Sequence, residues 1–238
     1  MIFSAVYKPT ALFSLRDSNS TSSGAKSLFL PSPYAIKMAL INQAISLGGV
    51  NFNAEPQKFH VIRDLKINFR ISGNFCVNNC LLKIQKKRGD EPFKPTVGFR
   101  EYLFLDSDLE IIFETNANDV DLFDKTEDNM LFLKKYLCTI NQLGKRGCFF
   151  QFVKFNDNPL PANVLPFEIG RQLFYGILQE YDDFDENLIF DNVNSYSESK
   201  TKRVKKIMVL PIMRTDASKS YTTYKVLFTE DDKMKSTL

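Results

Sequence analysis

The sequence has no tryptophan and only one histidine, His60, among its 238 residues. A Ser–His or Cys–His nucleophile needs a histidine beside the attacking group, so any such site would depend on His60. His60 stands next to Phe59 at the start of a segment with strand-like alternation, and a surface position is the favoured interpretation. The composition therefore favours a binding protein over an enzyme built on these nucleophiles.

Cysteine is scarce as well, with four residues at positions 76, 80, 138 and 148. Cys76 and Cys80 have no second pair at zinc-ligand spacing, and a disulfide framework is not indicated either. The carboxylates crowded at 106–128 and 182–191 favour a solvated or protein-facing surface over a metal site. We expect free thiols, no metal and no cofactor.

Long apolar runs are also missing, so the sequence indicates no membrane-spanning helix. The start of the chain, MIFSAVYKPTALF, lacks the basic segment and apolar stretch of a secretory signal. We therefore expect a cytoplasmic protein that does not contact a membrane.

Charge is present in abundance but is unevenly distributed. Residues 1–100 hold 14 Lys and Arg against 5 Asp and Glu, residues 101–200 hold 8 against 19, and residues 201–238 hold 9 against 4. Basic ends around an acidic middle suggest a polyanion on one surface and a different partner on another. The alternative is a fold that brings the opposite charges together.

Phenylalanine is the other abundant feature, with 22 Phe beside 9 Tyr. Most of these rings are expected to pack a β-rich core. A few could stack on bases, because an aromatic face accepts any base.

The order of elements predicts an α+β fold. Ser32 and Pro33 begin a helix that Gly48-Gly49 ends, with Ile36, Leu40, Ile41, Ala44 and Leu47 on its apolar side. The other predicted elements are a strand at 2–15 that is interrupted near Pro9, strands at 59–71, 75–87, 98–105, 109–114 and 148–155, a loop at 16–27, a helix at 126–142 capped by Thr126, and late strands at 205–213 and 221–228.

This order is the ferredoxin-like β-α-β-β-α-β plan that RNA-recognition modules also use. We place this domain at residues 1–156, with a projecting thumb hairpin at about 82–98, and a β-rich extension at 157–238. Fold alone does not specify function.

Basic residues accompany aromatic ones on the predicted thumb. Cations on phosphates and a ring between bases suit single-stranded RNA. The residues concerned are Lys83, Lys86, Lys87, Arg88, Phe93, Lys94, Phe99 and Arg100, and Arg16 and Lys26 bracket the loop at 16–27.

A second basic feature is Gly144-Lys145-Arg146-Gly147, which lies between a predicted helix and a predicted strand. That order is the reverse of a nucleotide-binding P-loop. The turn could offer backbone N–H groups and two cations to an RNA phosphate, or it could be a plain turn.

Several segments, taken in order, resemble the Cas five family of the RAMP superfamily. They are the amino-terminal run KPTALFSLRDSNSTSSGAKSLFLPSPYAIKMAL, then FREYLFLDSDLEIIF, then LGKRGCFFQF, and together they span about residues 1–155. The region after residue 156 matches no family motif.

The resemblance implies a subunit of a type I Cascade-like CRISPR complex that binds the 5′ handle of crRNA. It also implies contacts with the backbone and large subunits, and with target DNA through the complex. The RNA-binding residues implied in this sequence are Arg16, Ser18, Asn19, Lys26, Tyr34, Lys83, Lys86, Lys87, Arg88, Phe93, Lys94, Arg100, Lys145 and Arg146.

Two other function classes stay open. Some members of the family cut precursor RNA with a Tyr, a Lys and a His; Tyr34 could replace that Tyr, but no Lys-His pair follows the thumb. We therefore expect no enzyme activity, with a metal-independent endoribonuclease as the alternative. The third class is a protein-interaction module that uses the acidic stretch at 101–200.

Overall fold

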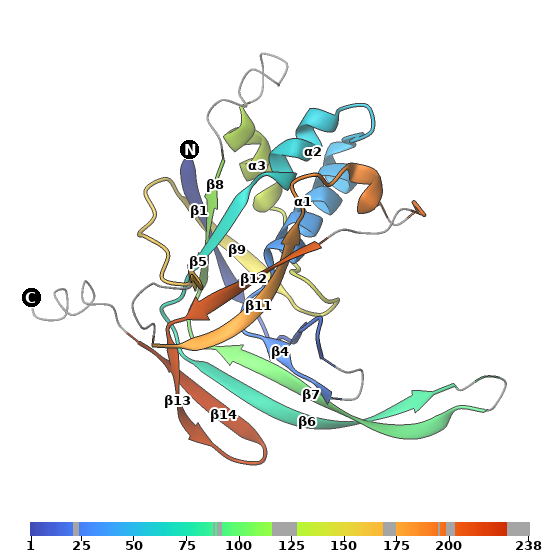
Figure 1. The fold of residues 1–238 in the computed structure, drawn as a ribbon, viewed down its shortest axis with the longest axis vertical. Coiled ribbons are helices and arrows are strands. Elements are labelled where there is room, and N and C mark those ends of the chain that lie inside the picture. Colours follow the sequence, from blue (N-terminus) through green and yellow to red (C-terminus); the bar gives the residue numbers. More distant parts are fainter. Residues whose placement is uncertain are drawn as a thin grey trace, which may run out of the picture.

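A computed structural model describes residues 1–20, 24–87, 89, 92–115, 128–168, 175–194, 196–198 and 203–227. These residues form an α+β fold with mainly antiparallel sheets, as predicted (Figure 1). The elements are β1 (Ile2–Pro9), β2 (Leu15–Arg16), β3 (Gly24–Ala25), β4 (Ser27–Leu28), α1 (Pro33–Gly48), α2 (Pro56–Arg63), β5 (Lys66–Arg70), β6 (Phe75–Lys86), β7 (Lys94–Leu105), β8 (Leu109–Glu114), α3 (Asn129–Leu137), β9 (Phe150–Asn156), β10 (Leu165–Pro166), β11 (Ile177–Phe184), the 3-10 helix η2 (Phe190–Asn192), β12 (Arg203–Leu210), β13 (Ile212–Ala217) and β14 (Tyr221–Val226).

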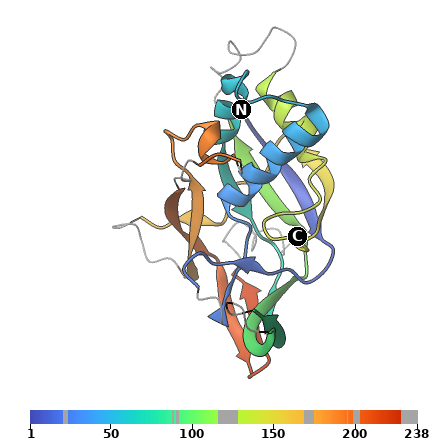
Figure 2. The ribbon, with the colours of Figure 1, turned by 90° about the vertical axis from the view of Figure 1, so that its right-hand side faces the viewer.

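The first sheet has four strands in the order β5-β8-β1-β9, and each neighbouring pair is antiparallel. Helices α1, α2 and α3 lie on one face of it (Figure 1, Figure 2). Alternate residues of a strand share a face, and Phe3, Ala5 and Tyr7 of β1 are all buried. The Tyr7 hydroxyl donates a hydrogen bond to the carbonyl of Leu137 in α3 at 2.8 Å, which ties the sheet to that helix.

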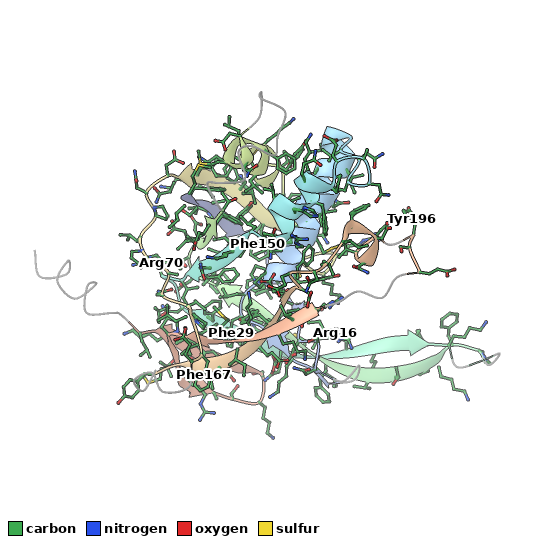
Figure 3. The ribbon with its side chains drawn as sticks, turned by 45° about the horizontal axis from the view of Figure 1, so that its top comes forward. Arg16, Phe29, Arg70, Phe150, Phe167 and Tyr196 are labelled. Atoms are coloured by element: carbon green, nitrogen blue, oxygen red, sulfur yellow. The ribbon has the colours of Figure 1, made fainter. Side chains whose placement is uncertain are left out.

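Phenylalanine rings fill much of this core, as the composition suggested. The rings of Phe3 and Phe113 lie 5.3 Å apart, and so do those of Phe13 and Phe150. Phe150 lies inside the body of the molecule in Figure 3. According to the strand registers, polar residues such as Asn68 and Lys154 lie on the other face of the sheet. The described strand residues of that face therefore present no aromatic ring to a base.

Helix α1 begins and ends as predicted. The Ser32 side chain accepts a hydrogen bond from the Ala35 N–H at 3.2 Å, and Gly49 closes the helix with φ 62°. Leu47, however, is 65% exposed, although the sequence predicts it on the apolar side of the helix. Gly48 takes the packing position of that last turn, because a Cβ there would lie 2.0 Å from the Tyr136 hydroxyl.

The predicted strand at 59–71 is wrong in its first half, because residues 56–63 form helix α2 and only β5 is a strand. Pro56 stands at the first helical position, which favours a helix start. Phe59 and Ile62 then share the buried side of the helix at i, i+3 spacing. His60 accordingly lies on a helix and is half-buried.

Helix α3 is shorter than predicted. Asp128 caps it by accepting a hydrogen bond from the Met130 N–H at 3.1 Å, and the predicted cap Thr126 lies outside the described residues. The helix ends at Leu137 instead of the predicted residue 142, and Leu131 on its outer side is 58% exposed. The chain leaves the helix early because residues 141–143 instead bond to the start of β9.

A second sheet has the order β13-β14-β6-β7-β3, and a third has the order β10-β12-β11. Strand β14 pairs with β6, so the late part of the chain widens the sheet at the base of the β6–β7 hairpin. The predicted boundary at residue 156 stays a prediction. Among the described residues, no helix is both long and apolar enough to cross a membrane.

Candidate nucleic-acid interface

The β6–β7 hairpin projects from the body as a long twisted ribbon (Figure 1). Its two strands pair continuously from Phe75 opposite Leu105 to Lys86 opposite Lys94, which confirms the predicted hairpin. Since paired residues share a face, Leu81 and Phe99 lie side by side on one face, with Lys83 and Val97 next along it. Leu81 is 59% exposed and Phe99 61%, so this face is an open apolar surface with a lysine beside it.

The loop after β2 is attached to the hairpin. Strand β3 pairs in parallel with β7 at Phe99 and Arg100, and the Ser27 N–H donates to Glu101 Oε2 at 2.8 Å. Buried Ser27 and these pairings show that the segment at 16–27 is anchored at its end, not an open loop throughout. A hollow of about 540 Å³ results, and its lining includes Lys26, Leu81, Phe99, Arg100 and Lys219. We call it the thumb hollow.

The structure thus places Lys26 and Arg100 in the lining of one hollow, although they are 74 positions apart in the sequence. Ser27 and Glu101, which are joined by the hydrogen bond, are separated by the same number of positions. Lys83, Lys87, Phe93 and Lys94 follow along the hairpin, and all four are exposed. Arg88 and the side chain of Lys86 lie outside what the structure describes.

Ser18 and Asn19 face a different environment. Ser18 Oγ donates to Asp182 Oδ1 at 3.4 Å, and Asn19 Nδ2 donates to Glu180 Oε1 at 2.8 Å, so both side chains point to acids of β11. Hydrogen bonds from Lys205 and Asn19 hold the pKa of the Glu180 carboxyl below its usual range. Arg16 is exposed and lies near the point where the hairpin leaves the body (Figure 3).

A groove of about 480 Å³ separates α1 from the turn at 141–145, and we call it the helix groove. Tyr34 and Lys145, two residues of the predicted set, both line it. The turn bends at Gly144 with φ 76° and at Gly147 with φ 95°, backbone conformations that favour glycine. Arg146 is exposed on the same turn.

Sequence reasoning missed Arg203, which lies close to Tyr34. The guanidinium carbon of Arg203 is 4.0 Å from the centre of the Tyr34 ring, a cation–π contact, and its Nη1 is 3.0 Å from Asp182 Oδ2. The ring of Phe184 packs edge-on against Tyr34 as well, at 5.2 Å. The only signal in the sequence was the excess of Lys and Arg over Asp and Glu in residues 201–238, and this excess does not single out Arg203.

Some of the described cations are paired with acids, and others are not. Arg203, Lys205 and Lys206 pair with Asp182, Glu180 and Asp183, so the carboxyl-terminal cations meet acids of the middle segment. Other cations make no salt bridge with a described residue, among them the predicted RNA-binding residues Arg16, Lys26, Lys83, Lys87, Arg100, Lys145 and Arg146, and also Lys8, Lys154, Arg214, Lys219 and Lys225. The fold therefore brings part of the opposite charges together, as the alternative interpretation expected, and the polyanion partner stays a prediction.

A polar cavity of about 470 Å³ lies beside the thumb hollow, and its lining includes Asp17, Lys26, Glu101 and Tyr224. Burial, followed by the Glu101 carboxylate, raises the pKa of the Tyr224 hydroxyl. This cavity is more acidic than its neighbour and is less suited to a phosphate.

The described residues contain no group of three His, Cys, Asp or Glu side chains that could hold a metal ion. His60 lines a small cavity of about 130 Å³ with Phe52, Phe59 and Phe190, and Tyr34 lines the separate helix groove. The two residues considered for acid–base work are therefore not neighbours in one cavity.

A comparison with curated proteins found one from Archaeoglobus fulgidus named "CRISPR-associated protein Cas5", which is 31% identical over 137 residues. The match covers 52% of this chain and 59% of that protein, so the chain spans about three fifths of the length of the relative. No family model matches the chain. The curated relative confirms the resemblance to the Cas five family that the motifs indicate.

Among solved structures, a CRISPR protein from Archaeoglobus fulgidus aligns with a TM-score of 0.44 and 15% identity, over 96% of this chain and 93% of that one. A functionally uncharacterized protein from Streptococcus mutans aligns with a TM-score of 0.24 and 14% identity, over 79% and 82% of the two chains.

Proposed function

We propose that this chain is a non-catalytic, CRISPR-associated RNA-binding subunit of a type I Cascade-like complex, and that it holds the 5′ handle of crRNA. The observation that carries the proposal is that cations of the hairpin side and of the 144–147 turn line two hollows of the surface and make no salt bridge with a described residue. Cations that no carboxylate neutralises are available to phosphates, and RNA phosphates supply most of the affinity in such complexes.

The exposed rings of the hairpin support the same function. Phe99 lines the thumb hollow beside Lys26 and Arg100, and Phe93 is 66% exposed toward the tip. A ring flanked by cations suits an unpaired base attached to its phosphate. The four-stranded sheet itself offers no described ring on its open face, so we assign the RNA to the hairpin side and the helix groove.

We further infer that the first sheet and its helices follow the ferredoxin-like plan. The order β9-β1-β8-β5, with α1 after β1 and α3 after β8, supports it. The β6–β7 hairpin is then an insertion between the second and third strands. By analogy with the family, this hairpin would reach the backbone subunit, and target DNA would be contacted only through the complex.

Charge reversal on the hairpin tests the proposal. The double variant Lys83→Glu/Lys87→Glu should retain less crRNA, and the slope of log affinity against log salt should fall by roughly 0.7 for each cation removed. Lys154→Glu is the matched control, because Lys154 is an exposed lysine of β9, on the polar face of the first sheet. Retention and salt slope equal to wild type in the double variant would argue against the hairpin as an RNA-binding element.

The endoribonuclease alternative has its own test. Purified protein is incubated with repeat RNA, with and without His60→Ala, and the products are separated by size. We expect intact RNA in both reactions. Cleavage that disappears in the variant would overturn the non-catalytic assignment.

The protein-interaction alternative is tested on the complex purified from cells and treated with nuclease. A protected small RNA should copurify with the chain. Recovery of the complex without such RNA would favour a protein-only role for the acidic middle segment.

A further inference from the structure

Amide side chains converge in the helix groove from two separate elements. Asn42 and Gln43 come from α1, and Asn141 and Gln142 come from the segment that faces it. Ala35, Met38 and Ala39 form an apolar floor between them, one and two turns before Asn42 on the same side of the helix.

Both walls of the groove are fixed to the core. Ile36, Leu40 and Ala44 anchor α1, each of them at most 1% exposed. On the other wall, Leu143 is fully buried, its N–H donates to the Cys148 carbonyl at 3.2 Å, and the Asn141 carbonyl accepts from the Phe150 N–H at 3.0 Å. Side chains on rigid walls can recognise a ligand with little loss of conformational entropy.

Three of the four amides are available for a ligand. Gln43 accepts a hydrogen bond from the Thr139 hydroxyl at 3.3 Å. The side-chain amides of Asn42, Asn141 and Gln142 make no hydrogen bond with another residue in the described part of the chain. Each therefore has a donor and an acceptor that solvent or a ligand must satisfy.

We propose that the helix groove holds one unpaired nucleobase and recognises it through its hydrogen-bonding edge, an inference that rests on the proposed RNA-binding function. An amide offers one acceptor and two donors, the complement of the edge of a base, and each good bidentate pair favours the correct base by about 5- to 150-fold. The apolar floor fits the flat face of the ring, and Met38 adds a sulfur that packs well against aromatic rings. Lys145 supplies a cation for the attached phosphate.

The chemistry of the groove separates it from the thumb hollow. The hollow presents a ring and three cations beside the single carboxylate of Glu101, and a ring with cations serves any base equally. The helix groove presents amides, which distinguish one base from another. The first site would contribute affinity, and the second would contribute sequence preference.

The test measures the affinity of the full chain for short oligo(A), oligo(C) and oligo(U), and for an abasic ribose-phosphate oligomer of equal length. We expect wild type to prefer one homopolymer over the other two by roughly 10-fold or more. Asn42→Leu and Asn141→Leu, which keep the size of the side chain but remove its hydrogen-bonding groups, should abolish that preference. Their affinity for the abasic oligomer should stay unchanged.

Asn158→Leu is the control, because Asn158 is an exposed asparagine outside the groove. Equal affinity of wild type for the three homopolymers would overturn the inference while leaving salt-dependent RNA binding, and thus the proposed function, intact. A preference that survives both groove variants would also overturn it. Failure to bind any of the oligomers would contradict the inference and the proposed function together.

Discussion

Lys37 Nζ lies 2.7 Å from Asp183 Oδ1, in a buried contact that joins α1 to β11 across 146 residues of sequence. The side chains of Lys37 and Asp183 are only 3% and 6% exposed. Lys37 also donates to the Arg63 carbonyl at 2.8 Å, and Lys206 reaches the other oxygen of Asp183 at 2.9 Å. One carboxylate therefore holds two ammonium groups and connects α1, the end of α2 and the third sheet.

Substitutions in this pair should have unequal effects. Asp183→Asn leaves the buried Lys37 without its counter-ion, and we expect a loss of about 3–5 kcal/mol in the free energy of unfolding. Lys37→Met leaves Asp183 paired with Lys206, so the loss should be smaller, about 1–3 kcal/mol. Denaturant titration followed by circular dichroism measures both, and equal losses would contradict this account.

Alkaline pH should destabilise the protein through Tyr7. Burial, followed by the nearby Cys138, raises the pKa of the Tyr7 hydroxyl above its ordinary value. The folded state then keeps a proton that the unfolded state loses above a pH of about 10, so this stabilisation is present below that pH and is lost as the pH rises.

The variant Tyr7→Phe isolates this effect. Relative to the variant, wild type should lose up to about 1.4 kcal/mol of unfolding free energy for each pH unit above 10. Denaturation curves of both proteins between neutral pH and pH 11 provide the measurement. Parallel pH profiles would show that Tyr7 does not contribute.

The two exposed rings of β7 provide a matched pair. Phe99 and Phe104 are 61% and 51% exposed and lie on opposite faces of the strand, but only Phe99 lines the thumb hollow. Phe99→Ala should weaken RNA binding by about 1–3 kcal/mol, the usual value of one base stacked on a ring. Phe104→Ala should leave RNA binding nearly unchanged. Filter-binding or fluorescence titration measures the RNA affinity of both variants, and equal losses would contradict the role of Phe99.

Glycines of the basic turn provide a second pair. Both Gly144 and Gly147 have positive φ, so alanine at either position costs about 1–2 kcal/mol of backbone strain. At Gly144 the added Cβ would also lie 2.9 Å from a methyl group of the buried Leu15, whereas nothing lies within 4 Å at Gly147. Gly144→Ala should therefore lower the melting temperature more than Gly147→Ala, and the reverse order would contradict the packing argument.

Local signals in the sequence were sufficient where one short segment decides the structure. Ser32, Pro33 and Gly49 set the ends of α1 because each acts on its immediate backbone neighbours. The continuous pairing of β6 and β7 follows from two strand-like segments that are separated by a short polar stretch of sequence. The same kind of reasoning failed at 56–63, since apolar residues at i, i+2 and i+3 fit a strand and a short helix equally.

The sequence by itself determined the basic amino-terminal stretch, the caps of α1, the projecting hairpin and the motifs that resemble the Cas five family. Only the tertiary structure decided which cations stay unpaired, because the carboxylates that neutralise Arg203, Lys205 and Lys206 come from a different strand, β11. It also decided that Lys26 and Arg100 line one hollow and that Tyr34 and Lys145 line another. Such contacts depend on strand pairing and helix packing between segments far apart in the chain, and no local pattern encodes them.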